Sequence, residues 1–168
     1  MSDPLLQDLM DHVRNRFYGK YRGVVTDVDA ATMRVKAAVP SVLPDTGTGW
    51  CMPCVPYAGP QVGVVMLPEV GSGVWIEFEG GDVSYPIWVG MYWQAGEIPS
   101  AASATVKSII TSAGSLAMDN DAGSITLTDA QQNTVVLDSS GVTCTSGSSS
   151  VAIGASGVNV NSGAFEVS

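Results

Sequence analysis

The chain of 168 residues carries a formal net charge of −9 and holds only seven lysines and arginines. Nucleic-acid backbones are bound by clustered basic side chains, so this composition argues against a nucleic-acid partner. The sequence lacks the run of about eighteen apolar residues that a membrane-spanning helix needs, and its first eleven residues include three aspartates, unlike a secretory signal, so we expect synthesis and folding in the cytoplasm.

Aromatic residues and prolines divide the sequence into two parts. Eleven of the twelve aromatic residues and all nine prolines lie before Ser100. The first part therefore has the material for a compact core, whereas the second has the composition of an elongated repeat. We place a helix at residues 1–18, a barrel at 19–96, a linker at 97–107 and a repeat domain at 108–168.

The first segment predicts an amphipathic helix over residues 4–18. Ser2 or Asp3 can cap this helix, Pro4 suits its first position, and Gly19 ends it. Its apolar stripe must be buried, either on its own domain or in a groove of another protein. The stripe consists of Leu5, Leu6, Leu9, Met10, Val13 and Phe17.

Apolar and polar residues alternate from Tyr21 onward, which predicts strands. The expected strands are a hairpin of residues 21–28 and 33–39, followed by 49–53, 63–66, 73–79 and 85–92. Five or six short antiparallel strands in about 75 residues favour a small Greek-key barrel, of which the OB-fold is a common example.

The last part repeats an apolar-x-apolar triplet every seven to ten residues. In an extended strand, the outer two side chains of each triplet fall on one face. Two apolar residues per strand cannot close a core, so the repeat predicts packing against copies of itself or a partner. A disordered Ser/Gly tail is the alternative, which the sustained triplets disfavour. The expected core residues are Leu116, Met118, Ile125, Leu127, Val135, Leu137, Val142, Cys144, Val151, Ile153, Val158, Val160, Phe165 and Val167.

Two short motifs are weak candidates for metal or redox sites. Cys51 and Cys54 have CxxC spacing, but no helix is expected there to activate a thiol, and His12 is the only histidine for a zinc site. Residues 119–123 resemble a calcium loop without its bidentate glutamate, and a turn with Gly123 at positive φ is simpler. We expect structural cysteines, with a labile disulfide as the alternative, and no metal or cofactor.

Catalytic groups are equally sparse. One histidine on a polar helix face is a poor base for a serine or cysteine nucleophile. Glu77 and Glu79 alternate with Ile76 and Phe78 along a strand, which predicts solvated carboxylates and not an acid–base pair. We therefore expect no enzyme activity.

Two stretches resemble the OB-fold core of contractile-tail spike proteins, a family that includes phage baseplate assembly protein V, phage central spikes and the VgrG spikes of type VI secretion. Residues 68–82 are PEVGSGVWIEFEGGD and residues 85–93 are YPIWVGMYW. They match the family's P-x-V-G turn, its strand ending in E-F-E-G-G-D and its P-x-x-x-G strand. Residues 21–25 and 34–40 also resemble the family, so the likeness covers most of residues 19–93.

The resemblance implies an all-β homotrimer in which the barrel continues into an intertwined trimeric β-helix, held by interchain backbone hydrogen bonds and a stacked apolar core. It implies a central spike in the virion tail baseplate, assembled in the host cytoplasm, that mechanically pierces the target cell envelope. The implied partners are a trimeric tail hub and a PAAR-like tip protein at the C-terminal end. The residues that we assign to the hub contact are Leu5, Leu9, Met10, Val13, Phe17, Lys20 and Arg22.

Departures from the family limit what it implies. Only residues 94–106 separate barrel and repeat, so no lysozyme-like insert is present and cell-wall digestion is not expected. No histidine follows residue 12, so the iron-binding tip strands of some relatives are absent, and the tip is either metal-free or capped by another protein.

Other readings stay open at this point. An OB-fold can bind oligosaccharide or nucleic acid, with Trp50, Trp75, Trp88 and Trp93 as a stacking platform, although the acidity disfavours nucleic acid. The spike can also belong to a type VI secretion system or to an extracellular contractile injection system. A cell-wall hydrolase is the weakest alternative, because a catalytic constellation is missing.

Overall fold

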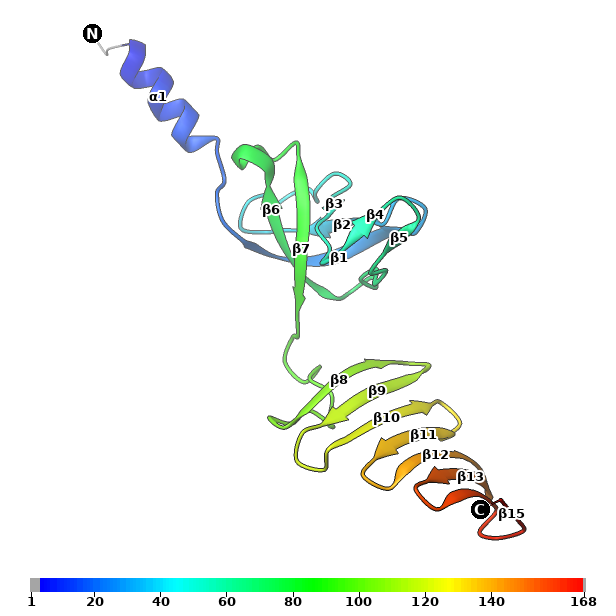
Figure 1. The fold of residues 1–168 in the computed structure, drawn as a ribbon. Coiled ribbons are helices and arrows are strands. Elements are labelled where there is room, and N and C mark those ends of the chain that lie inside the picture. Colours follow the sequence, from blue (N-terminus) through cyan, green and yellow to red (C-terminus); the bar gives the residue numbers. More distant parts are fainter. Residues whose placement is uncertain (1–3, 168) are drawn as a thin grey trace. The chain divides into compact units, whose positions relative to one another are not determined.

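A computed structural model describes the backbone of residues 4–167, which divides into two compact units, Met1–Glu97 and Ile98–Ser168 (Figure 1). The expected capping residues Ser2 and Asp3 lie outside this description, as do the side chains of Leu6, His12 and Val167.

The N-terminal helix α1 spans Pro4–Arg14 and is shorter than the predicted 4–18. Phe17 lies beyond its end, where the ring packs edge-on against Tyr21 and Phe78 at centroid distances of 6.2 and 6.4 Å. The Phe17 N–H also donates to the Gly81 carbonyl at 2.8 Å. These contacts with the barrel replace the last helical turn, because the aromatic ring is buried better there than on an exposed helix.

The first unit contains a curled, OB-like half-barrel. Its five-stranded sheet has the order β2-β1-β6-β7-β3. The strands are β1 (Tyr21–Asp29), β2 (Arg34–Ala38), β3 (Met52–Pro53), β6 (Gly73–Phe78) and β7 (Pro86–Tyr92), with the short 3-10 helix η1 (Glu79–Gly81) between β6 and β7.

The middle of the barrel unit departs from the prediction. The expected strand 49–53 is reduced to β3, which pairs with β7 in parallel and not antiparallel. An isolated bridge between Val35 and Cys51 brings this segment back beside β2. The expected strand 63–66 shrinks to β5 (Val62–Gly63), which forms a separate hairpin with β4 (Ala58–Gly59).

Apolar side chains from all five strands or their ends fill the barrel core. Val35, Val74 and Ile76 are fully buried, and Cys51 lies among them. The Cys51 sulfur is 3.2 Å from the Thr48 hydroxyl, and burial raises the pKa of the Cys51 thiol. All three cysteines are free thiols. The buried core residues are Val25, Val35, Ala37, Val39, Cys51, Val74, Ile76, Phe78 and Trp88.

The second unit is one antiparallel sheet in which each strand pairs with its neighbours in sequence. Every predicted triplet lies in a strand, and β8 precedes them as an additional strand that begins at Val106, ahead of the expected boundary at 108. The strands are β8 (Val106–Thr111), β9 (Gly114–Asp119), β10 (Ser124–Asp129), β11 (Thr134–Asp138), β12 (Gly141–Ser146), β13 (Ser149–Gly154), β14 (Gly157–Val160) and β15 (Phe165–Val167).

The pairing corrects one expectation for the second unit. Interchain backbone hydrogen bonds were expected between the strands, yet the strands from β9 to β14 are paired on both sides within the same chain. Short turns make this pairing local, and local pairing loses less chain entropy than pairing with another copy. Contact with other copies is therefore left to side chains.

A matched pair of valines tests the barrel core. Val74 is 0% exposed in β6, whereas Val70 is 60% exposed in the preceding turn. Val74→Ala removes two buried methyl groups and leaves a cavity, so we expect a loss of about 2–3 kcal/mol in the free energy of unfolding. Val70→Ala is expected to lower the free energy of unfolding by well under half of that amount. Urea unfolding followed by tryptophan fluorescence measures both, because all four tryptophans lie in this unit; equal losses would contradict the assignment of the core.

Candidate functional site

The sheet of the second unit carries two rows of large apolar side chains on one face. Strand register places opposed residues on the same face, and residues two apart along a strand share that face. The first row is Ile109, Leu116, Leu127, Val135, Cys144, Val151, Val160 and Phe165. The second row is Met118, Ile125, Leu137, Val142, Ile153 and Val158. The expected core residues of the repeat belong to these two rows, apart from Val167, whose side chain lies outside the described residues.

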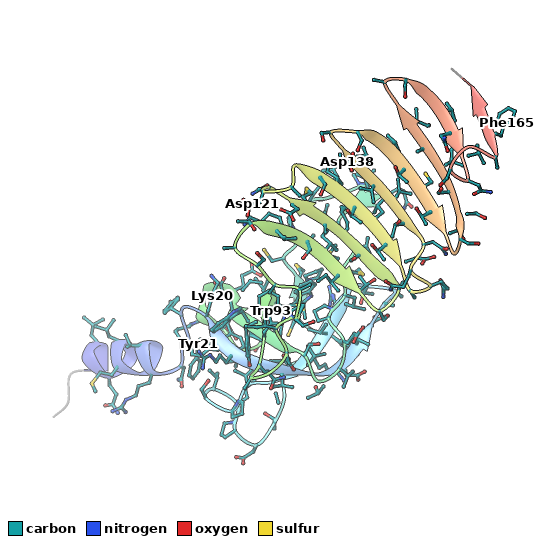
Figure 2. The ribbon with its side chains drawn as sticks, turned by 90° about the horizontal axis from the view of Figure 1, so that it is seen from below. Lys20, Tyr21, Trp93, Asp121, Asp138 and Phe165 are labelled. Atoms are coloured by element: carbon teal, nitrogen blue, oxygen red, sulfur yellow. The ribbon has the colours of Figure 1, made fainter. Side chains whose placement is uncertain are left out.

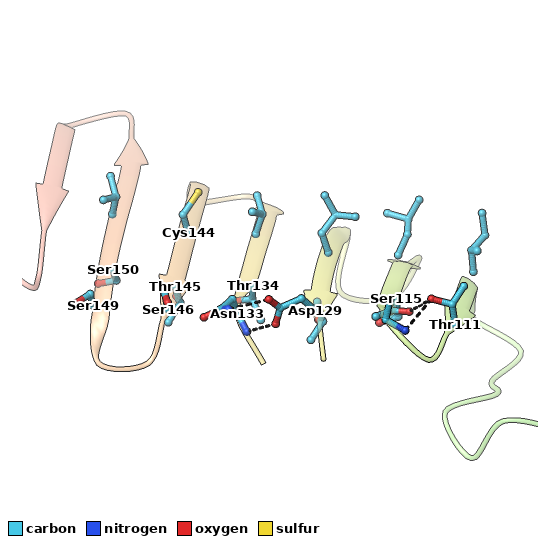
Figure 3. Close-up of a pocket in the computed structure, with 18 of the residues that line it drawn as sticks. Thr111, Ser115, Asp129, Asn133, Thr134, Cys144, Thr145, Ser146, Ser149 and Ser150 are labelled. Carbon is cyan, nitrogen blue, oxygen red and sulfur yellow. Dashed lines mark hydrogen bonds between the residues drawn. The ribbon is translucent and has the colours of Figure 1, made fainter. Parts of the chain in front are cut away.

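This apolar face is open in the single chain. Leu127 is 48% exposed, Ile153 52% and Phe165 63%. The first row, apart from Phe165, lines a hollow of about 830 Å³. Figure 3 shows the Cys144 sulfur projecting from the sheet. Monomeric soluble proteins rarely leave a contiguous apolar surface of this kind uncovered, so it is the strongest candidate for an interaction surface.

The opposite face has a different composition. Its central row, read across the paired strands, is Ser108, Ala117, Thr126, Val136, Thr143, Ala152 and Asn159. These side chains are small, and most of them are polar or alanine. A face of this kind suits contact with water, so only the face with the two rows needs a partner.

Aspartates close several turns at the sheet's edges. The Asp129 carboxylate accepts from the backbone N–H groups of Gln131 and Asn133 at 2.9 and 2.8 Å and from the Asn133 side-chain amide at 2.8 Å (Figure 3). Asp138 similarly accepts from the hydroxyl and the backbone N–H of Ser140 at 2.6 and 2.7 Å. The Asn133 side-chain amide and then the backbone N–H groups lower the pKa of Asp129, and the Ser140 hydroxyl and then its backbone N–H lower the pKa of Asp138, because these hydrogen bonds favour the charged carboxylate.

The turn at residues 119–123 confirms the prediction made for the calcium-like motif. Asp119 accepts from the backbone N–H groups of Asp121 and Ala122 at 2.9 and 3.1 Å, and Gly123 has a φ of 62°. Figure 2 shows Asp121 and Asp138 on the same edge of the sheet. The aspartate oxygens at this turn therefore serve the backbone.

Glycine is required where two strands begin. Gly114 opens β9 at a φ of 152° and Gly141 opens β12 at 130°. A Cβ atom on Gly114 would collide with the Thr128 carbonyl oxygen, and one on Gly141 would collide with the Ile153 carbonyl oxygen. These positions let the chain reverse tightly, so the strands stay short and in register.

The residues assigned to the hub contact fall into two groups. Leu5, Leu9, Met10 and Val13 are exposed on α1. Phe17, Lys20 and Arg22 instead contact the barrel. The ammonium group of Lys20 lies 2.8 Å from the Glu77 carboxylate, and the guanidinium of Arg22 lies over the rings of Trp75 and Tyr92.

The four tryptophans do not share one stacking platform. Trp88 is 5% exposed and its indole N–H donates to the Met33 carbonyl at 3.2 Å. Lys36 lies over the Trp50 ring, with the nitrogen 4.5 Å from the centroid, and Arg22 lies over Trp75. The rings that an oligosaccharide would need are therefore buried or already covered, apart from the exposed Trp93.

The described part of the chain contains neither a cluster of metal ligands nor a helix able to span a membrane. Among those residues, no three His, Cys, Asp or Glu side chains are gathered closely enough to hold a metal ion. Within the same residues, none of the helices has the length and apolarity required to cross a membrane.

One member of the apolar face was missed in the sequence. Ile109 in β8 opposes Leu116 and lines the hollow. Its strand breaks the triplet pattern, because Ile110 follows directly and Lys107 occupies the position that opposes Met118. The signal in the sequence that could have identified this strand is the pair of adjacent isoleucines, Ile109 and Ile110, after Ser108.

Comparison with known families gives a match for each unit. Residues 21–93 match the model described as the type VI secretion system/phage-baseplate injector OB domain. Residues 108–166 match the model described as the phage baseplate V C-terminal trimerisation domain. Together the two matches cover most of the chain. A search of curated proteins returns no match.

Acid is expected to destabilise the sheet through its capping aspartates. Because the folded pKa of Asp129 is lowered, its stabilising contribution is complete above the unfolded value of about 3.9 and is lost as pH falls through the lower folded value. Asp129→Asn should therefore reduce thermal stability at neutral pH. It should also make the loss of stability below about pH 4 less steep. Thermal unfolding followed by far-UV circular dichroism at decreasing pH measures this.

Asp121→Asn is the matched control, because it removes the same charge at a carboxylate that accepts none of the turn hydrogen bonds found here. If Asp129→Asn and Asp121→Asn change the pH dependence of thermal unfolding equally, then net charge, and not capping, causes the loss of stability in acid.

Proposed function

Because the chain belongs to the phage baseplate V family of injector proteins, with an OB domain followed by a C-terminal trimerisation domain, we propose that it is the homotrimeric central spike of a contractile tail baseplate. The family role is structural, and the trimerisation domain implies a homotrimer. In this proposal the spike sits at the tip of the virion tail and is driven through the target cell envelope by tail contraction. It performs no catalysis and needs no cofactor.

The open apolar face is the observation that carries this proposal. Three copies of the sheet, each turning its two rows toward a common axis, bury Leu127, Ile153 and their neighbours together. Each copy then supplies one third of a narrow core, which explains why a strand needs only two large side chains. The small polar face of every copy stays outside, in contact with water.

The backbone pairing within each chain supports one way in which the copies join. Hydrogen bonds between strands run within each chain along the stack, while side chains of the two rows make the contacts between chains. Strands twist with a fixed hand, so three such sheets coil around one another. We infer that they form the intertwined β-helix as three wrapped sheets, with eight strands stacked over about 35 Å at the usual spacing.

Two partners are proposed from exposed apolar side chains on α1 and β15. The exposed apolar residues of α1, among them Leu9 and Val13, are assigned to the tail hub, since Phe17, Lys20 and Arg22 already have barrel contacts. The last strand β15 has one open edge and an exposed Phe165. Such an edge invites a covering protein, and a PAAR-like tip protein is the proposed cap.

A type VI secretion system or an extracellular contractile injection system is the alternative setting for the spike, and the OB-domain match names both type VI secretion and the phage baseplate. Electron microscopy of assembled particles, with this chain carrying a label on the barrel unit, tests the proposed place at the baseplate tip. A label found along the sheath or in the head would contradict it.

Solution mass tests the trimer directly. The full chain is expected to be three times the monomer mass of 17.4 kDa in light scattering coupled to size exclusion. Leu127→Asp places a carboxylate in the shared core, where an unpaired charge costs several kcal/mol, and should abolish the trimer. Thr126→Asp adds the same charge on the opposite face of the same strand and should leave the trimer intact.

Two outcomes would refute the interface. A wild-type chain that stays monomeric at high concentration would remove the trimer itself. Loss of the trimer in Thr126→Asp but not in Leu127→Asp would show that the copies meet through the opposite face of the sheet, and not through the face with the two apolar rows.

A further inference from the structure

One row position of the apolar face holds a positive charge. Lys107 in β8 opposes Met118, the first member of the second row, and lies two residues before Ile109 of the first row. Opposed residues share a face of the sheet, as do residues two apart along a strand. The lysine is therefore on the face with the two rows, at a position that each strand from β9 to β14 fills with an apolar side chain. It is also the only basic residue between residues 37 and 168.

No carboxylate of its own chain pairs with Lys107. None of the ion pairs found among the described residues includes this lysine. Its ammonium group donates instead to the carbonyl oxygen of Ala104. An ammonium group has three N–H donors, so this hydrogen bond leaves two of them free. The charge is thus held in place but is not neutralised.

The described aspartates of the second unit are directed elsewhere. Asp119 and Asp138 each directly follow a row residue in their strands, so they lie on the opposite face. Asp129 is on the apolar face but lies beyond the first row, and its carboxylate accepts three hydrogen bonds from its own turn. Asp121 lies in the turn between β9 and β10. A counter-ion for the lysine must therefore come from outside the sheet.

We propose that three copies of Lys107 bind one small tetrahedral oxyanion, inorganic phosphate or sulfate, at the β8 end of the shared core. This inference rests on the proposed homotrimer, because the site is incomplete in a single chain. When the two rows of each copy face a common axis, Lys107 faces that axis as well. Three ammonium groups brought together repel one another, and an anion between them converts this repulsion into attraction.

The donor set determines the class of ligand. Lysine offers donors and no acceptor, so a ring of three lysines excludes metal cations. Two free N–H donors from each copy give about six in total, which suits the several acceptor oxygens of a tetrahedral oxyanion. Hydrogen bonds between charged partners are short and strong, and lysine binds phosphate as a point charge. Because β8 is the outermost strand of the sheet, an ion reaches the site without separating paired strands.

Inorganic phosphate tests the site in the full chain. Thermal unfolding is followed by far-UV circular dichroism at pH 7, in sodium phosphate and in sodium chloride of equal ionic strength. Saturating phosphate should raise the midpoint of the wild type by about 2–4 °C, because it binds the folded trimer and not the unfolded chain. Sodium sulfate should act in the same way as phosphate. Isothermal titration calorimetry should give one phosphate for three chains.

Two methionine substitutions assign the effect to Lys107. Lys107→Met keeps a long, unbranched side chain and removes the ammonium group, so the midpoint of this variant should be the same in phosphate and in chloride. Lys20→Met is the matched control, because it removes the same charge from the barrel, where Lys20 pairs with Glu77. This control should retain the rise in midpoint that phosphate causes in the wild type.

The outcomes separate the anion site from the proposed function. A wild-type trimer whose midpoint is equal in phosphate and in chloride overturns the anion site and leaves the homotrimer standing. A phosphate effect that persists in Lys107→Met also overturns it, because the ion then binds elsewhere. A wild-type chain that stays monomeric overturns the homotrimer and the anion site together.

Discussion

The constraint on which the second unit depends is a sheet with only one apolar face. Most strands contribute two large apolar side chains to that face, whereas the central row of the other face consists of serine, threonine, alanine, asparagine and one valine. One sheet of this kind has nothing within its own unit to bury its rows against, so burial of the rows requires other copies. The shortness of the strands, the small size of the outer residues and the family's trimeric state all follow from this single requirement.

Backbone and side chains make different kinds of contact in this sheet. Strand pairing is completed within the chain by tight turns, where glycines such as Gly114 allow close reversal and aspartates such as Asp129 satisfy free N–H groups. The side chains of the two rows are then left for contact between copies. In the proposed trimer, backbone hydrogen bonds run along each sheet and apolar packing holds the copies together.

The barrel unit differs from the second unit, because its strands enclose a buried core of their own. Its aromatic residues are used inside or at the edge of that core: Phe17 ends the helix by packing on Phe78, and Trp88 is buried with its N–H bonded. This use of the rings weakens the oligosaccharide-binding alternative, against which the acidity of the chain did not count. The apolar side chains of α1 stay exposed, among them Leu9 and Val13, which fits contact with another protein.

The sequence by itself determined the strands of the repeat, the face on which each triplet side chain lies and the turn at Gly123, because a period of two and the preferences of a turn are local properties. It also identified the family through the motifs around Pro86. The end of α1 at Arg14, the parallel pairing of β3, the burial of Trp88 and the pairing of each strand within its own chain were decided only by the tertiary structure. All of these depend on contacts between residues far apart in the sequence or on a competition between partners, which periodicity does not encode.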